Sequence, residues 1–555
     1  MTLFASTRQY PLAVPRQLAN NADWVLGTLI LNPMPTKPAN MPYQQIRAST
    51  LVLVALGGLI HLGYGFLLGF SVDEAHYALY AEKLDWSYFD HPPLVGWIQW
   101  PLVALHAPIG VIRLIPETLW LISSLLAWQL ARDPALPAIL RLPSSAANKS
   151  MANIANDTGA SVDRQRELAG LWAVCLILVA PVLHVLAVGL LPDTLLMAVT
   201  LGLMKLTLQV CQKNSVRQIS WQQWLSLGLL LGLAGLSKYT AIFSALAVAA
   251  VLLRHFGLAI FRCAGLWLAT VVALTLVAPV FYWNLTHDWI SLAYQIQHGS
   301  GGDWEFKRFL LFFLIQLGAF GPLLVGATAI TVGLGIKQRQ LQGLTMLLFF
   351  LIPFLITAYL AGGGGLPHWT APAWLAASPF AARLVAQDWS EGRRRLIKLL
   401  IFIQVFICAL MFTLLFWGGI PGIAEKDSLG KQNPIADLWG WDQAGSVARD
   451  LAVKLGAPAI AVSNWTLASR MAWYAKPLAV YVLDDRFDQF DIWFGQIPRN
   501  SDTIFVNWSQ MKFDLPLKSG QFKACDLIET LPIARAGRDI STFNFYHCKN
   551  WGSQP

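Results

Sequence analysis

The sequence predicts an all-α polytopic membrane protein with about eleven transmembrane helices, amphipathic juxtamembrane helices and a small exported α/β domain at the C-terminal end. Of the 555 residues, 55% are apolar and only 13% are charged, whereas a soluble domain carries about 25% charged residues. The mean hydropathy is +0.50. Apolar runs of about twenty residues, the length that a helix needs to cross a bilayer, recur through the first three quarters of the chain. This composition excludes an intrinsically disordered chain, a collagen-like repeat and a small disulfide scaffold.

The first 47 residues are predicted to be an extension without fixed structure. The apolar run 24–32 is too short to cross a bilayer and lies between prolines. The segment also lacks the charged, apolar and small-residue regions of a cleavable signal peptide. We therefore expect this extension to carry no function, with Met41 as a candidate start of the functional chain.

Residues 48–418 are expected to form the transmembrane domain. Within it, residues 71–106 form the first exported loop, and residues 133–166, rich in Pro, Ala, Ser and Asn, form a flexible cytoplasmic insertion. The candidate spans lie at 48–70, 107–131, 168–190, 194–211, 223–236, 240–254, 263–283, 309–332, 342–361, 372–386 and 398–418.

The charges of the connecting loops predict the orientation. The formal net charge is +9, and most of the basic residues lie in every second loop, which predicts that these loops and the N-terminus face the cytoplasm. An odd number of spans then places the tail from residue 421 onward outside the cytoplasm. Because the basic residues mark topology, they do not indicate a surface for nucleic acid.

The tail, residues 421–555, is expected to form a small α/β domain. Apolar β-branched runs alternate there with helical patterns, which is typical of that fold class. The runs are Ala459–Val462, Val480–Leu483 and Ile504–Val506, and the helical stretches are Gln443–Leu455 and Leu467–Tyr474. Cys525 and Cys548 both lie in this tail, where an oxidising compartment would favour a disulfide between them. CxxC pairs and zinc-type Cys/His spacings are absent, so no structural metal is expected.

Two adjacent carboxylates, Asp73 and Glu74, stand where the first span leaves the bilayer. Carboxylates at this depth are costly unless they are solvated or used, and the simplest alternative is that they only end the helix at the interface. The following segment, 73–84, carries apolar residues on one helical face and returns through Pro92-Pro93. We expect this segment to lie along the membrane surface.

Other polar residues are expected at the same exported face. Asp193 lies in a short turn, where it could cap the next helix or serve a site. Lys238 and Arg113 could extend toward the interface as lone cations or bind a lipid phosphate. A glycine run, 362–365, precedes His368 and Trp369 in a flexible exported loop.

Several motifs of soluble enzymes are absent. The sequence holds no Walker A motif, no dinucleotide-binding glycine pattern and no DxD motif. An ATP-driven pump and an enzyme that binds a nucleotide sugar are therefore disfavoured, and neither a nucleotide nor a cofactor is expected. A divalent metal at the acidic loop is compatible with the sequence but is not required by it.

The first exported loop carries a distinctive series of residues: Asp73-Glu74-Ala-x-Tyr77, Trp86, Tyr88-Phe-Asp90-His91-Pro92-Pro93-Leu94 and Trp97. This series resembles the corresponding loop in the bacterial branch of the GT-C glycosyltransferases. That branch includes the aminoarabinose transferases of lipid A and relatives of the protein mannosyltransferases. Further landmarks in the expected order are Asp193-Thr-Leu-Leu, Gly235-Leu-Ser-Lys238-Tyr239 and His368-Trp369-x-Ala-Pro372-Ala. The resemblance covers roughly residues 48–390.

This resemblance implies an inverting transfer of a sugar from a polyprenyl-phosphate donor to an envelope acceptor, which could be lipid A, another glycan, a lipid or a protein. It implies that Asp73 is the general base and that Glu74 positions the acceptor or the loop. Tyr88 and Asp90 match positions near the donor, and Lys238, with His91 or Arg113, would balance the charge on the departing phosphate. The family often has a lysine where His91 stands. The resemblance places the protein in the bacterial inner membrane.

Two other classes of function are compatible with parts of the sequence. A polytopic transporter or flippase of a lipid-linked saccharide would carry ionisable residues near the bilayer midplane and internal repeats, neither of which is seen here. A non-catalytic assembly protein would use the exported tail to bind partners. Turnover of an Asp73→Asn variant distinguishes the enzyme from both.

Overall fold

The computed structural model describes residues 42–137, 159–300, 303–387, 389–418, 435–511, 514–518 and 521–552. Residues 1–41 with Met41, most of the predicted insertion 133–166 and the start of the tail at 421–434 lie outside these described residues. The first described helix, α2, already begins at Tyr43, so the predicted boundary of the extension at residue 47 is wrong. Pro42 precedes this helix, and a proline is tolerated there because the amide that it lacks has no partner within the helix.

Every predicted span coincides with one helix or with two consecutive helices. The helices of the bundle are α2 (Tyr43–Leu67), α5 (Ile109–Ile112), α6 (Leu114–Arg132), α7 (Gly159–Leu178), α8 (Pro181–Val188), α9 (Pro192–Val210), α10 (Trp221–Ser237), α11 (Ala241–Phe256), α12 (Ala264–Thr286), α14 (Phe306–Phe320), α15 (Pro322–Lys337), α16 (Leu341–Met346), α17 (Leu348–Leu360), α18 (Ala371–Val385) and α19 (Glu391–Trp417). Short 3-10 turns connect some of them: η4 (Val216–Gln218), η5 (Gly257–Arg262) and η6 (Pro367–Thr370).

The number of membrane crossings is supported only in part. Among the described residues, six helices are long and apolar enough to cross a membrane, or eight if each of two bent pairs forms one span. The remaining predicted spans consist of shorter helices: α10 has 17 residues, α17 has 13 and α18 has 15. The figure of about eleven therefore stays a prediction for these three.

Two of the predicted spans are not straight. The span predicted at 168–190 bends by 77° between α7 and α8, and the one at 309–332 bends by 118° between α14 and α15. Pro181 and Pro322 each start the second helix of a pair, and a proline lacks the amide that would continue the preceding helix. Gly321 adopts φ +83° at the sharper bend, a conformation that favours glycine.

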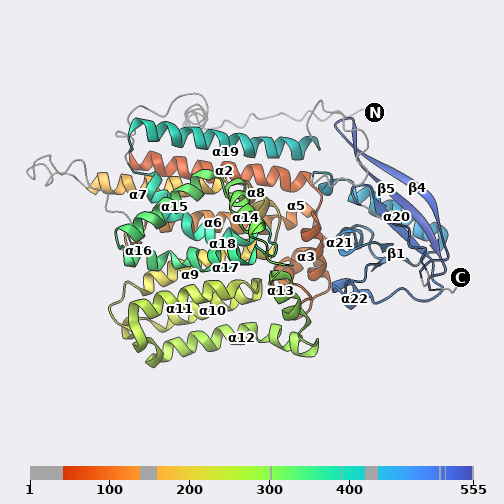
Figure 1. The fold of residues 1–555 in the computed structure, drawn as a ribbon, viewed down its shortest axis with the longest axis horizontal. Coiled ribbons are helices and arrows are strands. Elements are labelled where there is room, and N and C mark those ends of the chain that lie inside the picture. Colours follow the sequence, from red (N-terminus) through yellow and green to blue (C-terminus); the bar gives the residue numbers. More distant parts are fainter. Residues whose placement is uncertain are drawn as a thin grey trace, which may run out of the picture.

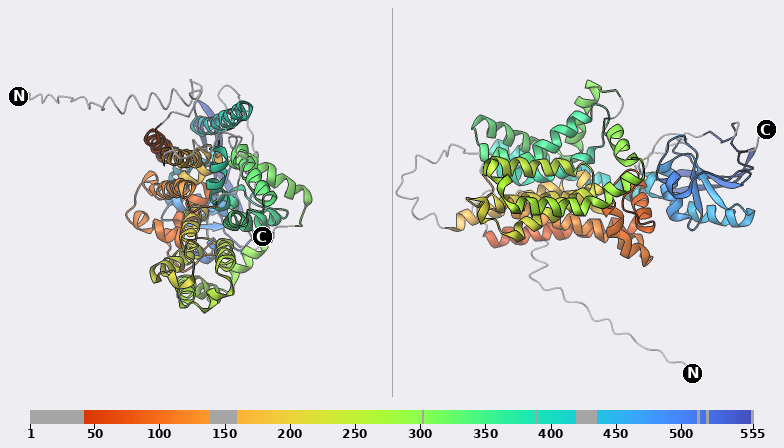
Figure 2. Two further views of the ribbon diagram at one scale, coloured as in Figure 1. Left: turned by 90° about the vertical axis from the view of Figure 1, so that its left-hand side faces the viewer. Right: turned by 90° about the horizontal axis from the view of Figure 1, so that it is seen from below.

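The bundle has a buried centre and exposed edges. The side chains of α18 are buried along almost its whole length, so this short helix has other helices and not lipid around it. The helices α12 and α19 lie on opposite sides of the bundle, as Figure 1 and Figure 2 show, and only 11% of the apolar window of each is buried. The apolar faces of these two helices are therefore the surfaces that a bilayer would cover.

A chain of buried polar side chains connects α2, α6 and α8. The Nδ1 atom of His61 lies 2.9 Å from Oε2 of Glu117, and its Nε2 atom lies 2.7 Å from Nδ1 of His184. Paired ionisable groups of this kind hold helices together where no water can solvate them. The helix α8 ends at Gly189, where an added Cβ would lie 3.4 Å from Cδ of Glu74. The end of α8 thus packs directly against the predicted acidic pair.

Three further helices lie at one end of the bundle: α3 (Val72–Glu82), α4 (Leu94–Ala104) and α13 (Ile290–Ser300). Pro93 precedes α4, as the proline pair predicts. Residues 74–81 of α3 are all buried, and the placement of 73–84 along the membrane surface stays a prediction. The helix lies between the bundle and the C-terminal sheet (Figure 1), where α21 (Trp465–Tyr474) packs against it.

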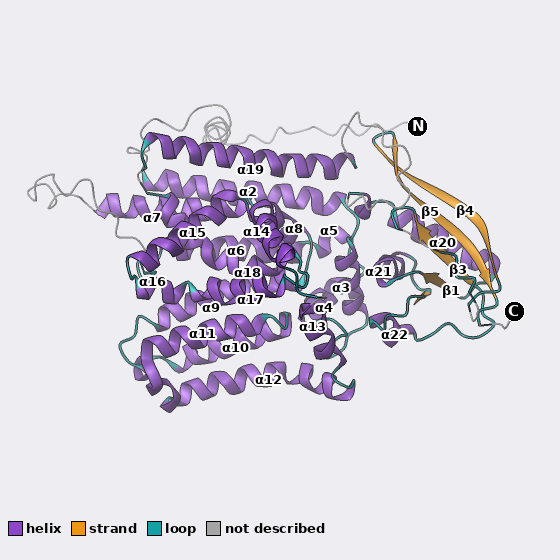
Figure 3. Ribbon diagram, in the orientation of Figure 1, coloured by secondary structure: helices purple, strands orange, loops and turns teal. Residues whose placement is uncertain are grey.

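The tail forms a five-stranded sheet with the order β2-β1-β3-β5-β4, drawn in orange in Figure 3. The strands are β1 (Ala459–Val462), β2 (Ala479–Val482), β3 (Thr503–Trp508), β4 (Ala524–Arg535) and β5 (Arg538–Lys549), with the helices α20 (Trp441–Leu455), α21 and α22 (Gln489–Phe494) and the turn η7 (Ala436–Leu438). β1 is parallel to β2 and β3, whereas β5 is antiparallel to β3 and β4. All three predicted runs are strands and both predicted helical stretches are helices. The β4–β5 hairpin was not predicted, and the expected disulfide between Cys525 and Cys548 joins its two strands.

Candidate active site

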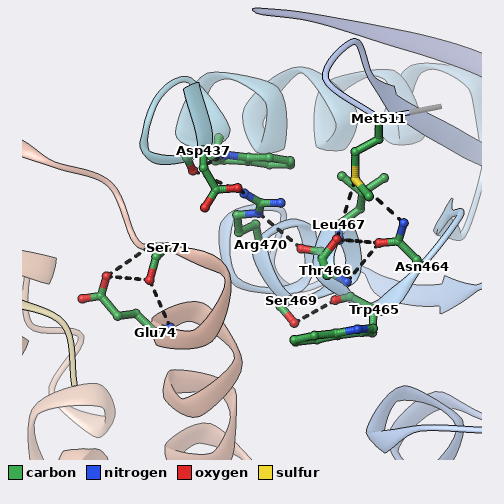
Figure 4. A network of polar contacts seen from close by, with 11 residues as sticks. Ser71, Glu74, Asp437, Asn464, Trp465, Thr466, Leu467, Ser469, Arg470 and Met511 are labelled. Atoms are coloured by element: carbon green, nitrogen blue, oxygen red, sulfur yellow. Dashed lines mark hydrogen bonds and ion pairs between the residues drawn. The ribbon is translucent and has the colours of Figure 1, made fainter. Parts of the chain in front are cut away.

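The acidic pair begins α3, and Glu74 fixes the start of that helix. The Oε2 atom of Glu74 accepts hydrogen bonds from the backbone N of Ser71 at 3.1 Å and from its Oγ atom at 3.0 Å. Ser71 in turn caps the first turn of α3, so the two residues form a capping box (Figure 4). This local arrangement holds the chain as it leaves the bundle and sets the position of Asp73 within the first turn.

Arg113 holds the same carboxylate from the other side. Its Nε lies 2.7 Å from Oε1 of Glu74 and one Nη lies 2.9 Å from Oε2. The other donors reach the carbonyl oxygens of Gly65, Leu68 and Gly69. The side chain is only 3% exposed and all five of its N–H groups are engaged. Arg113 therefore neither extends to the interface nor has a donor left for a lipid phosphate, and both expectations for it are wrong.

Asp73 differs from its neighbour because it has no such partner. The side chain is half-buried, and no hydrogen bond between described residues involves its carboxylate. Burial raises the pKa of Asp73 from the usual 3.8 to about 6, while His76 lowers it and the negative charges of Asp90, Asp437 and Glu74 raise it further. A carboxylate with a pKa close to neutral and free oxygens is suited to accept a proton.

Asp90 is a second half-buried carboxylate, and several donors hold it. The hydroxyl of Tyr80 donates to Oδ1, and Nε2 of His76 lies 3.5 Å from the same oxygen. The Nε2 atom of His91 lies 3.9 Å from Oδ2. Burial alone would raise the pKa of Asp90, but His76, His91 and Tyr80 together hold it well below its usual value. Asp90 is therefore ionised, and the hydroxyl of Tyr80 and the rings of His76 and His91 surround its charge.

His91 is an uncharged group at neutral pH. Burial lowers its pKa to about 4, with Lys238 lowering it and Asp90 and Asp193 raising it. Its Nδ1 atom is buried and has no hydrogen-bond partner among the described residues. A polar atom in that state normally has a partner, so His91 is able to hydrogen-bond a bound molecule but not to supply a positive charge.

Tyr88 does not take the place expected near a donor. It is fully buried, and its ring stacks on that of Tyr80 at 3.5 Å between centroids. Its hydroxyl lies 2.8 Å from the carbonyl oxygen of Tyr80, 3.1 Å from that of Lys83 and 3.0 Å from the backbone N of Asp85. Tyr88 therefore holds the loop between α3 and α4 in shape and has no free hydroxyl for a substrate.

Asp193 and Lys238 form a buried ion pair next to this loop. The Nζ atom of Lys238 lies 2.8 Å from Oδ1 and 2.7 Å from Oδ2 of Asp193, and both side chains are buried. Asp193 accepts no capping hydrogen bond in α9, so it does not act as a helix cap. Lys238 does not extend to solvent, so it is not a lone cation at the interface. Their charges influence the pKa of His91, which places the pair beside the Asp90 cluster.

The predicted substrate loop reaches the same pair. The Nε2 atom of His368 lies 3.7 Å from Oδ2 of Asp193, and Nζ of Lys238 lies 5.8 Å from the ring centroid of Trp369. Burial lowers the pKa of His368, although Asp193 raises it. The fold thus gathers residues from α3, α9, α10 and η6 at one end of the bundle.

Some residues of the site were not predicted from the sequence. His76, Tyr80 and Gln295 all contact Asp90, the last by donating to its backbone oxygen. Ser469, in the sheet domain, lies 3.1 Å from Nδ1 of His76. The position of His76 one turn from Asp73 was the only signal for it in the sequence, and nothing local marks Ser469 or Gln295. Among the described residues, no group of three or more His, Cys, Asp or Glu side chains is placed to hold a metal ion.

Comparison with known proteins identifies sequences and structures that are similar to this chain. Residues 164–283 match the family described as dolichyl-phosphate-mannose-protein mannosyltransferase. The lipid A galacturonosyltransferase RgtD of Rhizobium johnstonii is 24% identical over 333 residues, which make up 59% of this chain and 62% of that protein. The aligned part therefore spans less than two thirds of this relative.

Two crystal structures of ArnT from Cupriavidus metallidurans have a similar fold. One is the apo state and the other is bound to undecaprenyl phosphate, with 14% and 15% identity to this chain and a TM-score of 0.52 for each. Each match covers 90% of this chain and 98% of ArnT. These findings confirm the resemblance to the GT-C glycosyltransferases that the motifs predict.

Proposed function

We propose that the protein is an integral membrane glycosyltransferase that transfers a sugar from a polyprenyl-phosphate donor to an acceptor of the cell envelope, with inversion at the anomeric carbon. The observation that carries the proposal is Asp73: a half-buried carboxylate with a raised pKa and no hydrogen-bond partner among the described residues, beside a cluster of ion pairs at one end of the bundle. A buried acid without a partner is unusual in a structural role and is typical of a catalytic base. The ArnT and RgtD relatives support the same class of reaction.

In this proposal Asp73 accepts the proton of the acceptor hydroxyl. The acceptor oxygen then forms its bond to the anomeric carbon while the bond from that carbon to the phosphate oxygen breaks on the opposite face. The proton stays on Asp73 and the electron pair leaves with the polyprenyl phosphate. Glu74 and Arg113 hold the first turn of α3 so that the base keeps its position, but they do not touch the substrate.

Lys238 and His91 would receive the departing phosphate. Lys238 uses two of its three N–H donors on Asp193 and retains the third, and His91 offers Nδ1, which has no partner in the part of the chain that the structure describes. Asp193 acts on the donor through Lys238, because an anion does not bind a phosphate directly. Preorganised donors of this kind stabilise the charge that grows on a leaving group.

The acceptor belongs to the bacterial envelope, and lipid A is the acceptor that the name of RgtD carries. We place the chain in the inner membrane with the N-terminus in the cytoplasm and the sheet domain in the periplasm. In this orientation the ends of the bundle helices that surround α3 face the periplasm. The orientation is tested with a Lys83→Cys variant, treated in intact spheroplasts with an impermeant maleimide. Failure of the maleimide to label the introduced cysteine would place α3 on the cytoplasmic side.

The function is tested by mass spectrometry of lipid A and other envelope glycolipids from cells that lack the gene. Cells complemented with the wild-type chain should regain one glycosylated species, and cells complemented with Asp73→Asn should not, at equal membrane abundance. Binding of undecaprenyl phosphate to the purified variant should persist. Restoration of the glycolipid by Asp73→Asn would reject Asp73 as the base, and movement of a lipid-linked sugar without a glycoside product would favour the transporter.

A further inference from the structure

The sheet domain contributes a hydrogen bond to the centre of the candidate site. The Oγ atom of Ser469 in α21 lies 3.1 Å from Nδ1 of His76 in α3, and the same hydroxyl donates to the backbone oxygen of Trp465 at 2.8 Å. On its other side, His76 presents Nε2 to Oδ1 of Asp90 at 3.5 Å. The ring of His76 therefore stands between a serine of the tail and a carboxylate of the first loop.

These contacts determine where the protons of His76 lie. A hydroxyl has one hydrogen, and that of Ser469 goes to the Trp465 carbonyl, so its oxygen must accept from Nδ1–H of His76. Asp90 is ionised and already accepts the Tyr80 hydroxyl. A lone pair on Nε2 would face that negative charge unfavourably, whereas an N–H would be attracted to it. The arrangement is thus satisfied when both ring nitrogens carry a hydrogen and His76 is an imidazolium.

The surroundings of His76 exclude water and limit its movement. The side chain is only 5% exposed. Five aromatic rings pack around it at centroid distances of 5.0 to 6.0 Å, three of them from the sheet domain: Tyr77, Tyr80, Trp465, Phe490 and Trp493. Because so little water reaches this site, a hydrogen bond to a charged ring is stronger here than it would be in solvent.

A second contact anchors the same helix of the sheet domain. Arg470, the residue after Ser469, is fully buried and forms an ion pair with Asp437 (Figure 4). Its guanidinium lies 3.7 Å above the ring of Trp441 and 5.2 Å from that of Trp508. Because α21 is held in this way by its own domain, Ser469 is a rigid support for His76.

We propose that Ser469 and His76 are positioning residues through which the sheet domain acts on the sugar transfer. The hydroxyl of Ser469 holds His76 with both ring nitrogens protonated. His76 in turn orients the carboxylate of Asp90 and keeps a positive charge near Asp73. The inference rests on the proposed function, in which Asp73 is the base. It makes the C-terminal domain a part of the active site, because the hydroxyl that orients His76 comes from α21. His76 itself does not touch the reacting atoms.

The charges that face His76 come from several elements. Asp73 shares its helix, Asp90 and His91 lie in the following loop, and Asp488 precedes α22 in the sheet domain. The positive charge of His76 lowers the pKa of Asp73. Weakening that charge should therefore move the acidic side of the activity profile to higher pH.

The test compares Ser469→Ala with Ser541→Ala, measured on the full chain in nanodiscs. Ser541 is a matched control, since it is a buried serine of the same domain whose hydroxyl has no partner among the described residues. Ser469→Ala should lower kcat/KM about tenfold, the effect of losing one hydrogen bond to a charged group, and should shift the acidic limb to higher pH. Ser469→Thr should recover the wild-type limb. A pH profile of Ser469→Ala that coincides with that of Ser541→Ala would overturn the proposal.

A second measurement separates this inference from the proposed function. Thermal unfolding of the same variants requires no substrate. Ser469→Ala should lower the unfolding temperature more than Ser541→Ala, because it removes the acceptor of an N–H group on a buried ring, whereas the hydroxyl of Ser541 has no partner among the described residues. If the wild-type chain makes no glycoside, the proposed function fails while this difference still tests the Ser469–His76 pair. Equal unfolding temperatures of Ser469→Ala and Ser541→Ala would refute that pair.

Discussion

Replacing Asp73 by asparagine should make the protein more stable and less active, with a dependence on pH that follows from its burial. The pKa of this carboxyl is raised from 3.8 to about 6, chiefly because the site is poorly solvated. Each pKa unit corresponds to about 1.4 kcal/mol, so the folded protein loses about 3 kcal/mol by holding the charge. An asparagine has nearly the same shape and no charge, so the variant avoids this loss.

The difference in stability between Asp73→Asn and the wild type depends on pH. Below pH 3.8 the carboxyl is neutral in both the folded and the unfolded chain and destabilises neither. As the pH rises toward 6, the unfolded chain ionises first and the folded state loses stability, and above the folded-state pKa the loss is constant. Asp73→Asn should therefore exceed the wild type in stability at pH 7, by up to about 3 kcal/mol, and approach it near pH 4.

The assay is thermal unfolding of both proteins in the same detergent at several pH values, read by intrinsic tryptophan fluorescence. Asp450→Asn, at an exposed position of α20, is the control and should leave the unfolding temperature unchanged throughout. The kcat/KM of the wild type should fall about tenfold per pH unit below pH 6. An Asp73→Asn variant that is less stable than the wild type at pH 7, or an acidic limb near pH 4, would refute the reasoning.

The buried ion pairs and the disulfide each predict a measurable effect. Lys238→Met leaves the charge of Asp193 unpaired and should cost about 3–5 kcal/mol, whereas adding Asp193→Leu should recover most of the unfolding temperature without restoring binding of undecaprenyl phosphate. Arg113→Lys loses the bidentate contact with the carboxylate of Glu74 and should reduce the folded fraction and the activity equally. A raised KM for the donor would instead place Arg113 on the phosphate. Replacing Cys525 and Cys548 by serine opens a link between residues 23 apart and should lower the stability of the tail by about 3 kcal/mol, measured by limited proteolysis; unchanged proteolysis would contradict it.

Much of the fold follows from local features of the sequence. Apolar runs predicted every helix of the bundle because a residue run of that length and character has one stable state in a bilayer. The three apolar runs of the tail became β1, β2 and β3 because short runs of β-branched apolar residues favour buried strands. The two tail cysteines were correctly paired. The straightness of the spans was not predictable from hydropathy alone, although Pro181 and Gly321-Pro322 mark both bends in hindsight.

Part of the candidate site was predictable in its residues, but its contacts were not. The sequence indicated Asp73, Asp90, His91, Asp193, Lys238 and His368, and the fold brings these residues to one end of the bundle. It could not assign Arg113 to Glu74, since these residues are 39 positions apart and on different helices. The same limit hid the role of Tyr88, whose hydroxyl is used by backbone groups of its own loop.

The amino-acid sequence by itself determined the membrane class, the positions of the helices, the acidic loop and the residues able to form the disulfide, because each depends on hydrophobicity or chemistry within a short window of the chain. Only the tertiary structure decided which acid is free and which is paired. Glu74 is paired with Arg113, Asp193 with Lys238 and Asp90 with His76, and these partners are separated by 39, 45 and 14 positions. It also brought Ser469 to His76 across 393 positions. Charge pairing depends on distance in space, and a one-dimensional pattern does not contain that distance until the chain has folded.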